Sequence, residues 1–233
     1  MDVENKEIIL AKNKRVMLPL IIFSNLFPLY GVLMYNWTIF SVVYIYWIEL
    51  LIITFFQFLK IIVAQGEPRW SFSVNLFIGI KFLLLRAGLF LFYLLFIVVF
   101  LGFLASSKDD SGKSAMNMFD VVFFKGSFYR ITLLSYTLYN LIEFIVLYIL
   151  NNDYKTSKAT DHNNFLDMHI LVVHLVVVLG TFIYQGVTDT LHWNHKSAMI
   201  ACVSLFVVIK IIADVVRQSL SGDIVKDEPG NFI

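Results

Sequence analysis

The stretch Thr38–Ile62, TIFSVVYIYWIELLIITFFQFLKII, decides the fold, because it is apolar enough to cross a lipid bilayer yet carries Glu49 near its middle. A helix of about 20 apolar residues covers the ~30 Å hydrocarbon core. An ionised side chain at that depth costs at least ~2.5–3.5 kcal/mol, so it has to be paired, hydrated or in use. The stretch therefore predicts a transmembrane helix that belongs to a protein with a polar centre.

Five further apolar runs of similar length predict five further spans. They cover about Met17–Met34, Gly79–Leu104, Phe128–Leu150, Phe165–Tyr184 and Ser197–Arg217. Apolar residues make up 59% of the 233-residue chain, whereas soluble domains contain roughly 45–50%. The sequence thus predicts an all-α integral membrane bundle of six transmembrane helices. We also expect Trp70–Phe77, ahead of the third span, to form a separate interfacial helix.

The distribution of Lys and Arg predicts the orientation of this bundle. Basic residues such as Lys12, Arg15, Lys155 and Lys158 gather on one side, and fewer lie on the other. By the positive-inside rule, the N and C termini are expected to be cytoplasmic. The predicted organisation is a cytoplasmic or interfacial segment (1–16), one six-helix transmembrane domain (17–218) and a cytoplasmic tail (219–233). A plasma or inner membrane is expected.

Polar residues inside the predicted spans form the candidate site. Helix rise places most of them in the cytoplasmic half of the membrane, and the fourth span carries its polar residues on one stripe, which is expected to face the protein interior. Lys210 and Asp214 are one turn apart on the sixth span and can pair. The predicted intramembrane network consists of Asn25, Glu49, Arg86, Asn140, Glu143, His174, Lys210 and Asp214.

This network has two interpretations. In the structural one, its pairs fix the register of the helices and offset the cost of removing each charge from water. In the functional one, it binds a proton, an ion or a small polar ligand. Glu49 is singled out because a carboxyl near the midplane without a partner is expected to be protonated.

Several catalytic classes lack their motifs. The chain has no HExxH zinc motif, no Glu-Glu pair and no Gly-rich phosphate loop. One cysteine excludes an internal disulfide, and a net charge of +1 does not favour nucleic acid. Asp189, His192 and His195 have a spacing that could hold a metal, but an aromatic interfacial turn, TLHWNH at 190–195, explains them equally well. No cofactor is predicted.

Several motifs, in order along the chain, resemble a known family. The segment NLFPLYGVL at 25–33 is followed by YWIE at 46–49, and the chain closes with Lys210 and Asp214 in a KxxxD pattern. This order resembles a prokaryotic polytopic membrane-protein family catalogued as domain of unknown function 6498. The resemblance implies a multi-pass helical protein and no established activity.

The chain departs from the family pattern in its third and fourth spans. Members tend to carry His-Tyr-Gly where this chain has Arg86-Ala87-Gly88, and a second histidine near Asn140. The departures imply the loss of two histidines and the gain of an Arg86–Glu143 salt bridge.

Three classes of function remain open. The leading interpretation is a non-catalytic accessory or structural subunit, or a scaffold, whose partners are the lipid bilayer and either other membrane subunits or copies of itself. An alternative is a small proton- or ion-coupled transporter that uses Glu49, His174 and Lys210. A second alternative is a membrane-embedded metalloenzyme. The absence of a complete catalytic set favours a protein that is not an enzyme.

Overall fold

The computed structural model describes residues 3–97, 120–164, 170–172, 183, 186–187 and 193–223, without the side chains of 3–17, 195 and 217–223. Within these ranges every regular element is a helix. The α-helices are α1 (Val3–Tyr35), α2 (Ile39–Val63), α3 (Phe72–Phe96), α6 (Ser127–Ile142) and α8 (His195–Asp223). The π-helix η2 (Glu143–Leu150) continues α6, and two short 3₁₀ helices follow, η3 (Asp153–Lys155) and η4 (Ala159–His162).

Five helices of the described part are long and apolar enough to cross a membrane. The apolar stretches are Leu18–Tyr35, Ile39–Val63, Phe72–Phe96, Asp120–Leu150 and Lys196–Val216. The all-α prediction is therefore confirmed for the described residues, which contain a long apolar helix at five of the six positions where a span is expected. The expected span Phe165–Tyr184 lies almost entirely outside the described residues and stays a prediction.

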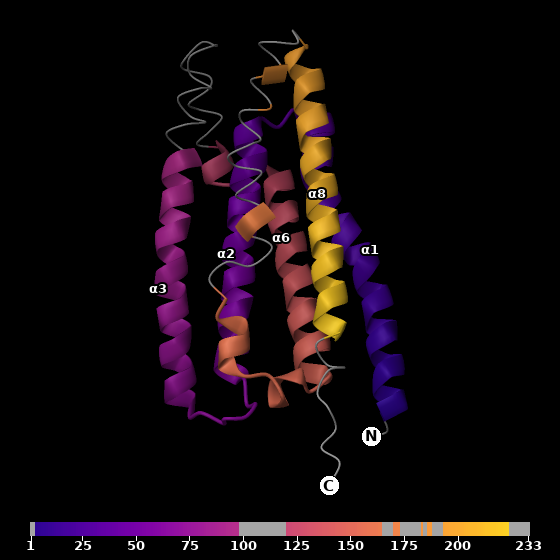
Figure 1. Ribbon diagram of the computed structural model, residues 1–233. Helices are drawn as coiled ribbons and strands as arrows, with labels where there is room; N and C mark the ends of the chain where they lie inside the picture. Colours follow the sequence, from indigo (N-terminus) through magenta and orange to yellow (C-terminus); the bar gives the residue numbers. More distant parts are fainter. Residues whose placement is uncertain are drawn as a thin grey trace.

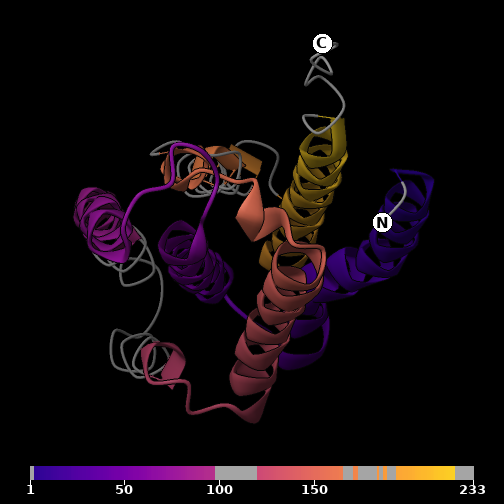
Figure 2. The same cartoon turned by 90° about the horizontal axis from the view of Figure 1, so that it is seen from below.

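Helix α2 forms the centre of the bundle (Figures 1 and 2). It packs against α3 and α6, while α1 packs against α8 and α6. About 67% of the α2 span is buried inside the protein, compared with 28% of the span in α3. The helix that carries Glu49 is thus the one most enclosed by other helices, whereas α3 is an edge helix.

Two helices begin earlier than the sequence predicts. Helix α1 is continuous from Val3 and contains both Pro19 and Pro28, so the 1–16 segment is largely part of the first helix. Helix α3 starts at Phe72, directly after its N-cap Ser71. The expected interfacial helix is therefore the first part of this span. Gly79 does not interrupt it, because one glycine costs only about 1 kcal/mol in a helix.

The connection between α2 and α3 is held by the segment that follows η2. The amide of Gln65 donates to the carbonyl of Tyr154 (2.7 Å), and the amide of Gly66 donates to that of Ser157 (2.9 Å). A Cβ atom on Gly66 would overlap the backbone of Thr156 and Ser157. Only glycine allows this close approach of two loops, which ties the α2–α3 connection to the fourth span.

The Gly66 contact leads to a stability prediction. Gly66→Ala should lower the thermal unfolding temperature of the detergent-solubilised protein, at a cost of about 1–3 kcal/mol, because a backbone cannot rotate out of the way as a side chain can. Gly88→Ala is the matched control, since a Cβ atom there meets nothing within 4 Å. Equal unfolding temperatures for the two variants would contradict the close approach.

Candidate functional site

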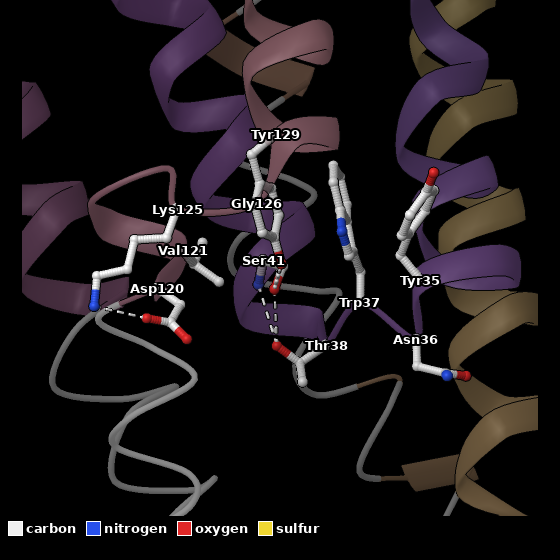
Figure 3. Close-up of a pocket in the computed structure, with 10 residues that line it drawn as sticks. All are labelled: Tyr35, Asn36, Trp37, Thr38, Ser41, Asp120, Val121, Lys125, Gly126 and Tyr129. Carbon is white, nitrogen blue, oxygen red and sulfur yellow. Dashed lines mark hydrogen bonds and ion pairs between the residues drawn. The ribbon is translucent and has the colours of Figure 1, made fainter.

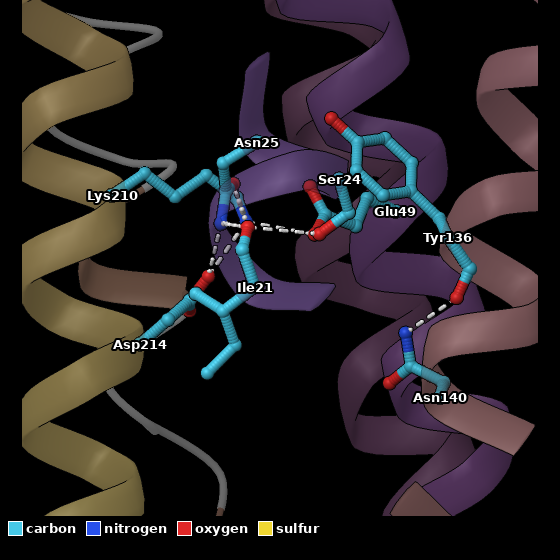
Figure 4. Close-up of polar contacts among 8 residues, drawn as sticks. All are labelled: Ile21, Ser24, Asn25, Glu49, Tyr136, Asn140, Lys210 and Asp214. Atoms are coloured by element: carbon cyan, nitrogen blue, oxygen red, sulfur yellow. Dashed lines mark hydrogen bonds and ion pairs between the residues drawn. The ribbon is translucent and has the colours of Figure 1, made fainter. Parts of the chain in front are cut away.

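Lys210 of α8 lies at the centre of a buried polar cluster that joins three helices (Figure 4). Its Nζ atom donates to Asn25 Oδ1 of α1 at 2.7 Å, to Glu49 Oε1 of α2 at 2.8 Å and to Asp214 Oδ2 at 3.2 Å. Lys210 and Asp214 face the same way because they are four residues apart on one helix. We call Asn25, Glu49, Lys210 and Asp214 the Lys210 cluster.

Asn25 links the first helix to the last. Its side-chain amide nitrogen donates to Asp214 Oδ2 at 2.8 Å and to the carbonyl of Ile21, one turn earlier, at 2.9 Å. Its oxygen accepts from Lys210. Both ends of the amide are therefore used, which fixes the rotamer of Asn25 and the position of the two α8 side chains.

The cluster is shielded from its surroundings. The exposed fraction is 0% for Asn25, 3% for Lys210 and 4% for both Glu49 and Asp214. Two aromatic rings flank the ammonium, with Lys210 Nζ 5.9 Å from the ring centre of Tyr46 and 5.8 Å from that of Tyr136. Charges this well buried are costly to leave unpaired. Any packing of α1, α2 and α8 that separates these side chains is therefore strongly unfavourable.

Three further residues of the predicted network, Asn140, Arg86 and Glu143, make contacts away from this cluster. Asn140 donates to the carbonyl of Tyr136 on its own helix at 2.9 Å. Arg86 donates to Thr54 Oγ1 at 2.9 Å and to the carbonyl of Asn164 at 2.8 Å. His174 lies outside the described residues.

Glu143 pairs with Lys60 at 3.0 Å, which differs from the Arg86–Glu143 bridge that the sequence predicts. Glu143 is the C-cap of α6 and the first residue of the π-helix η2. Lys60 was missed as a site residue because it lies near the end of its span. Its stem can nevertheless run along the helix and bring the ammonium back to a carboxylate.

A histidine completes this second site at the end of the bundle. The Tyr148 hydroxyl donates to the Lys60 carbonyl at 3.0 Å, and the His162 ring stands edge-on to the Tyr148 ring with 5.2 Å between their centres. His162 Nε2 is buried without a hydrogen-bond partner among the described residues. Burial, and secondly the charge of Lys60, lower the pKa of His162 to about 4, although Asp161 acts in the opposite direction.

A pocket opens at the opposite end of the bundle, beside the turn between α1 and α2 (Figure 3). Trp37 stacks on Tyr129 there with ring centres 4.4 Å apart, and Lys125 pairs with Asp120 at 3.0 Å on its rim. Aromatic side chains of this kind are typical of the zone between lipid tails and water.

The candidate metal site of Asp189, His192 and His195 lies outside the part of the chain whose side chains the structure describes. Asp189 and His192 lie outside the described residues, as does the side chain of His195. Within the described part, no group of three or more His, Cys, Asp or Glu side chains could hold a metal ion.

Comparison with known proteins supplies a family. A family model described as a family of unknown function, DUF6498, matches residues 10–228. The chain belongs to DUF6498. This confirms the family that the order of the motifs indicates, and the DUF6498 region contains all four residues of the Lys210 cluster. No curated protein and no solved structure matches the chain.

The buried His162 makes stability depend on pH. Its pKa in the folded protein, about 4, is below the ordinary 6.5, so folding favours the neutral ring. The neutral His162 ring therefore adds to the free energy of unfolding in full above pH 6.5. This contribution declines as the pH falls toward 4 and is lost below it. Because the His162 ring is partly exposed, we expect the free energy of unfolding to fall by about 2 kcal/mol between pH 7.5 and pH 4. Unfolding temperatures of the wild type and of His162→Phe between pH 7.5 and pH 4 should show a flatter pH dependence in the variant. Parallel curves would contradict the assignment.

Proposed function

We propose that the chain is a non-catalytic, multi-pass integral membrane protein of the plasma or inner membrane, which acts as an accessory or structural subunit. The observation that carries the proposal is the complete use of the Lys210 ammonium. Its three hydrogens are directed at Asn25, Glu49 and Asp214. A cation engaged in this way holds helices together and has no hydrogen left for a substrate.

The proposed topology has six spans, with both termini in the cytoplasm. Figure 1 shows that α1 begins and α8 ends at the same end of the bundle. Helix η4 also lies at that end, whereas α8 begins at the other. A sixth crossing within 165–184 would connect them, and the Lys and Arg residues favour the cytoplasm for the end that carries η3 and η4. Residues 17–218 would then form one domain between the 1–16 segment and the 219–233 tail.

Apolar side chains on the outer surface support partners within the bilayer. The lipid tails cover such surfaces in any membrane protein, and a subunit interface would use part of them. Phe77, Leu84 and Leu91 of the edge helix α3 are 69%, 70% and 66% exposed. These residues are spaced by seven along one face, which suits either a second copy of the chain or another membrane subunit.

The structural role predicts a large effect at Lys210. Lys210→Met would leave Glu49 and Asp214 buried without their ammonium, so we expect a loss of about 3–5 kcal/mol, measured as reduced unfolding temperature in a membrane mimetic. Lys196→Met is the matched control, because it is the same change on the same helix at an exposed position. Equal unfolding temperatures for Lys210→Met and Lys196→Met would contradict the structural role.

The subunit role predicts a partner. Native mass spectrometry of the tagged protein, gently extracted from its host membrane, should show a reproducible mass excess that corresponds to another polypeptide or to further copies of the chain. Substitution of Phe77, Leu84 and Leu91 by alanine should reduce that excess, while Phe92→Ala, an exposed residue on the same helix, should leave it unchanged. A bare monomer would contradict the subunit role.

A further inference from the structure

The pocket beside the turn between α1 and α2 combines charged and aromatic side chains. Its volume is about 450 Å³, which lies within the range of roughly 300–1,000 Å³ that is typical of small-molecule sites. Figure 3 shows the ion pair of Lys125 and Asp120 on one side of the pocket and the rings of Trp37 and Tyr35 on the other. The pocket therefore offers both signs of charge next to apolar surface.

The side chains between these two walls hold each other in place. Trp37 stacks on Tyr129 with an angle of 15° between the rings, and a Cβ atom on Gly31 would overlap the Trp37 ring. The Ser41 hydroxyl lies 3.2 Å from both the Thr38 and the Tyr129 hydroxyl. Because these groups are fixed before any ligand arrives, little of the binding free energy is lost in ordering them.

The turn that carries the ion pair is also fixed, and its backbone is strained. Phe124, directly before Lys125, has a φ of 49°, a left-handed backbone that is a genuine outlier for a bulky residue. The amide of Phe124 donates to the carbonyl of Val121 at 3.1 Å, and the amide of Lys125 donates to that of Asp120 at 2.9 Å. Strained backbone that neighbouring bonds hold in place is found preferentially at binding sites.

The pocket lies at the ends of three apolar stretches. One stretch ends at Tyr35, the next begins at Ile39, and a third begins at Asp120. Where these stretches cross a bilayer, the pocket lies at the level of the lipid headgroups. The side chains of Met34, Tyr35 and Phe123 beside it are 63%, 54% and 65% exposed. Apolar surface of this kind, next to a charged pocket, suits a ligand with a polar head and apolar chains.

We propose that this pocket binds the headgroup of a phospholipid that carries both a phosphate and a primary ammonium. The phosphate accepts hydrogen bonds from the Lys125 ammonium, and the headgroup ammonium donates to the Asp120 carboxylate. The side chains of Lys125 and Asp120 are 62% and 44% exposed. An ion pair this exposed contributes little to stability and can open readily. The headgroup then replaces one ion pair by two and leaves the total charge unchanged.

The charges of the pocket discriminate between headgroups. A headgroup with a phosphate and no ammonium would place a second negative charge beside Asp120 without a partner for it. A quaternary ammonium balances that charge but has no N–H group to donate to the carboxylate. A soluble molecule with the same two charges lacks the chains that the exposed Met34 and Phe123 would contact. A lipid with a primary ammonium is the ligand that uses all of these features.

The proposal goes beyond the subunit role, and it rests only on the part of that role that places the chain in a membrane. Extraction of host membranes with alkaline carbonate tests this part separately, because an integral protein stays with the lipid. Lipid binding without a partner polypeptide would contradict the subunit role alone.

Titration of the delipidated, full-length protein with synthetic lipids, followed by native mass spectrometry, tests the proposal. The wild type should bind one phosphatidylethanolamine about tenfold more tightly than phosphatidylglycerol or phosphatidylcholine. Lys125→Met should weaken phosphatidylethanolamine binding about tenfold. Asp120→Asn should remove the preference for phosphatidylethanolamine over phosphatidylglycerol without weakening phosphatidylglycerol binding. Lys196→Met is the matched control, because this exposed lysine lies at the start of α8, at the same end of the bundle, and it should bind as the wild type does.

Equal affinities of the wild type for the three lipids would overturn the proposal, and this comparison does not depend on the folding of any variant. Unchanged binding in Lys125→Met, or a preference that survives in Asp120→Asn, would overturn it as well. Free O-phosphoethanolamine is the probe for a soluble ligand. If it displaced the lipid as effectively as the lipid itself binds, the chains would contribute nothing and the occupant would not be a lipid.

Discussion

The ammonium group of Lys210 is the constraint on which the bundle depends. A lysine inside an apolar bundle is tolerated only where its hydrogens have acceptors, and here the acceptors come from α1, α2 and α8. Moving any of these helices along its axis would break a bond that water cannot replace. Helices α1 and α8 are thereby locked to α2, the most enclosed of the described helices, and α3 and α6 pack against α2.

Much of this arrangement could be predicted from the sequence. The α2 span was predicted to within one residue at each end, because a long apolar run leaves few alternatives. Asn25, Glu49, Lys210 and Asp214 could be singled out because polar residues are so costly in lipid, and the i,i+4 spacing of the last two predicted their pairing. The Lys210–Glu49 contact itself could not be derived from depth alone, since depth leaves the rotation of each helix open.

The parts that could not be predicted depend on local backbone geometry. Glu143 pairs with Lys60, and depth along the helices does not distinguish this partner from Arg86. Arg86 donates to a hydroxyl and to a backbone carbonyl, and no sequence pattern marks a backbone carbonyl as a partner. The position of Tyr46 beside the ammonium was also not predicted, because an aromatic residue in an apolar helix is ordinarily interpreted as a packing residue.

The separation of the cluster in sequence bears on how the chain is made. Glu49 and Lys210 are 161 residues apart, and Asn25 and Asp214 are 189 apart. At roughly 5–20 residues per second, the ribosome needs about 10–30 s to reach Lys210 after Glu49 has been synthesised. During that interval the nascent helix holds its carboxyl group without the lysine that later joins it. The newly made α2 must therefore wait beside the insertion machinery, or enter lipid with a neutral Glu49, until the final helix arrives.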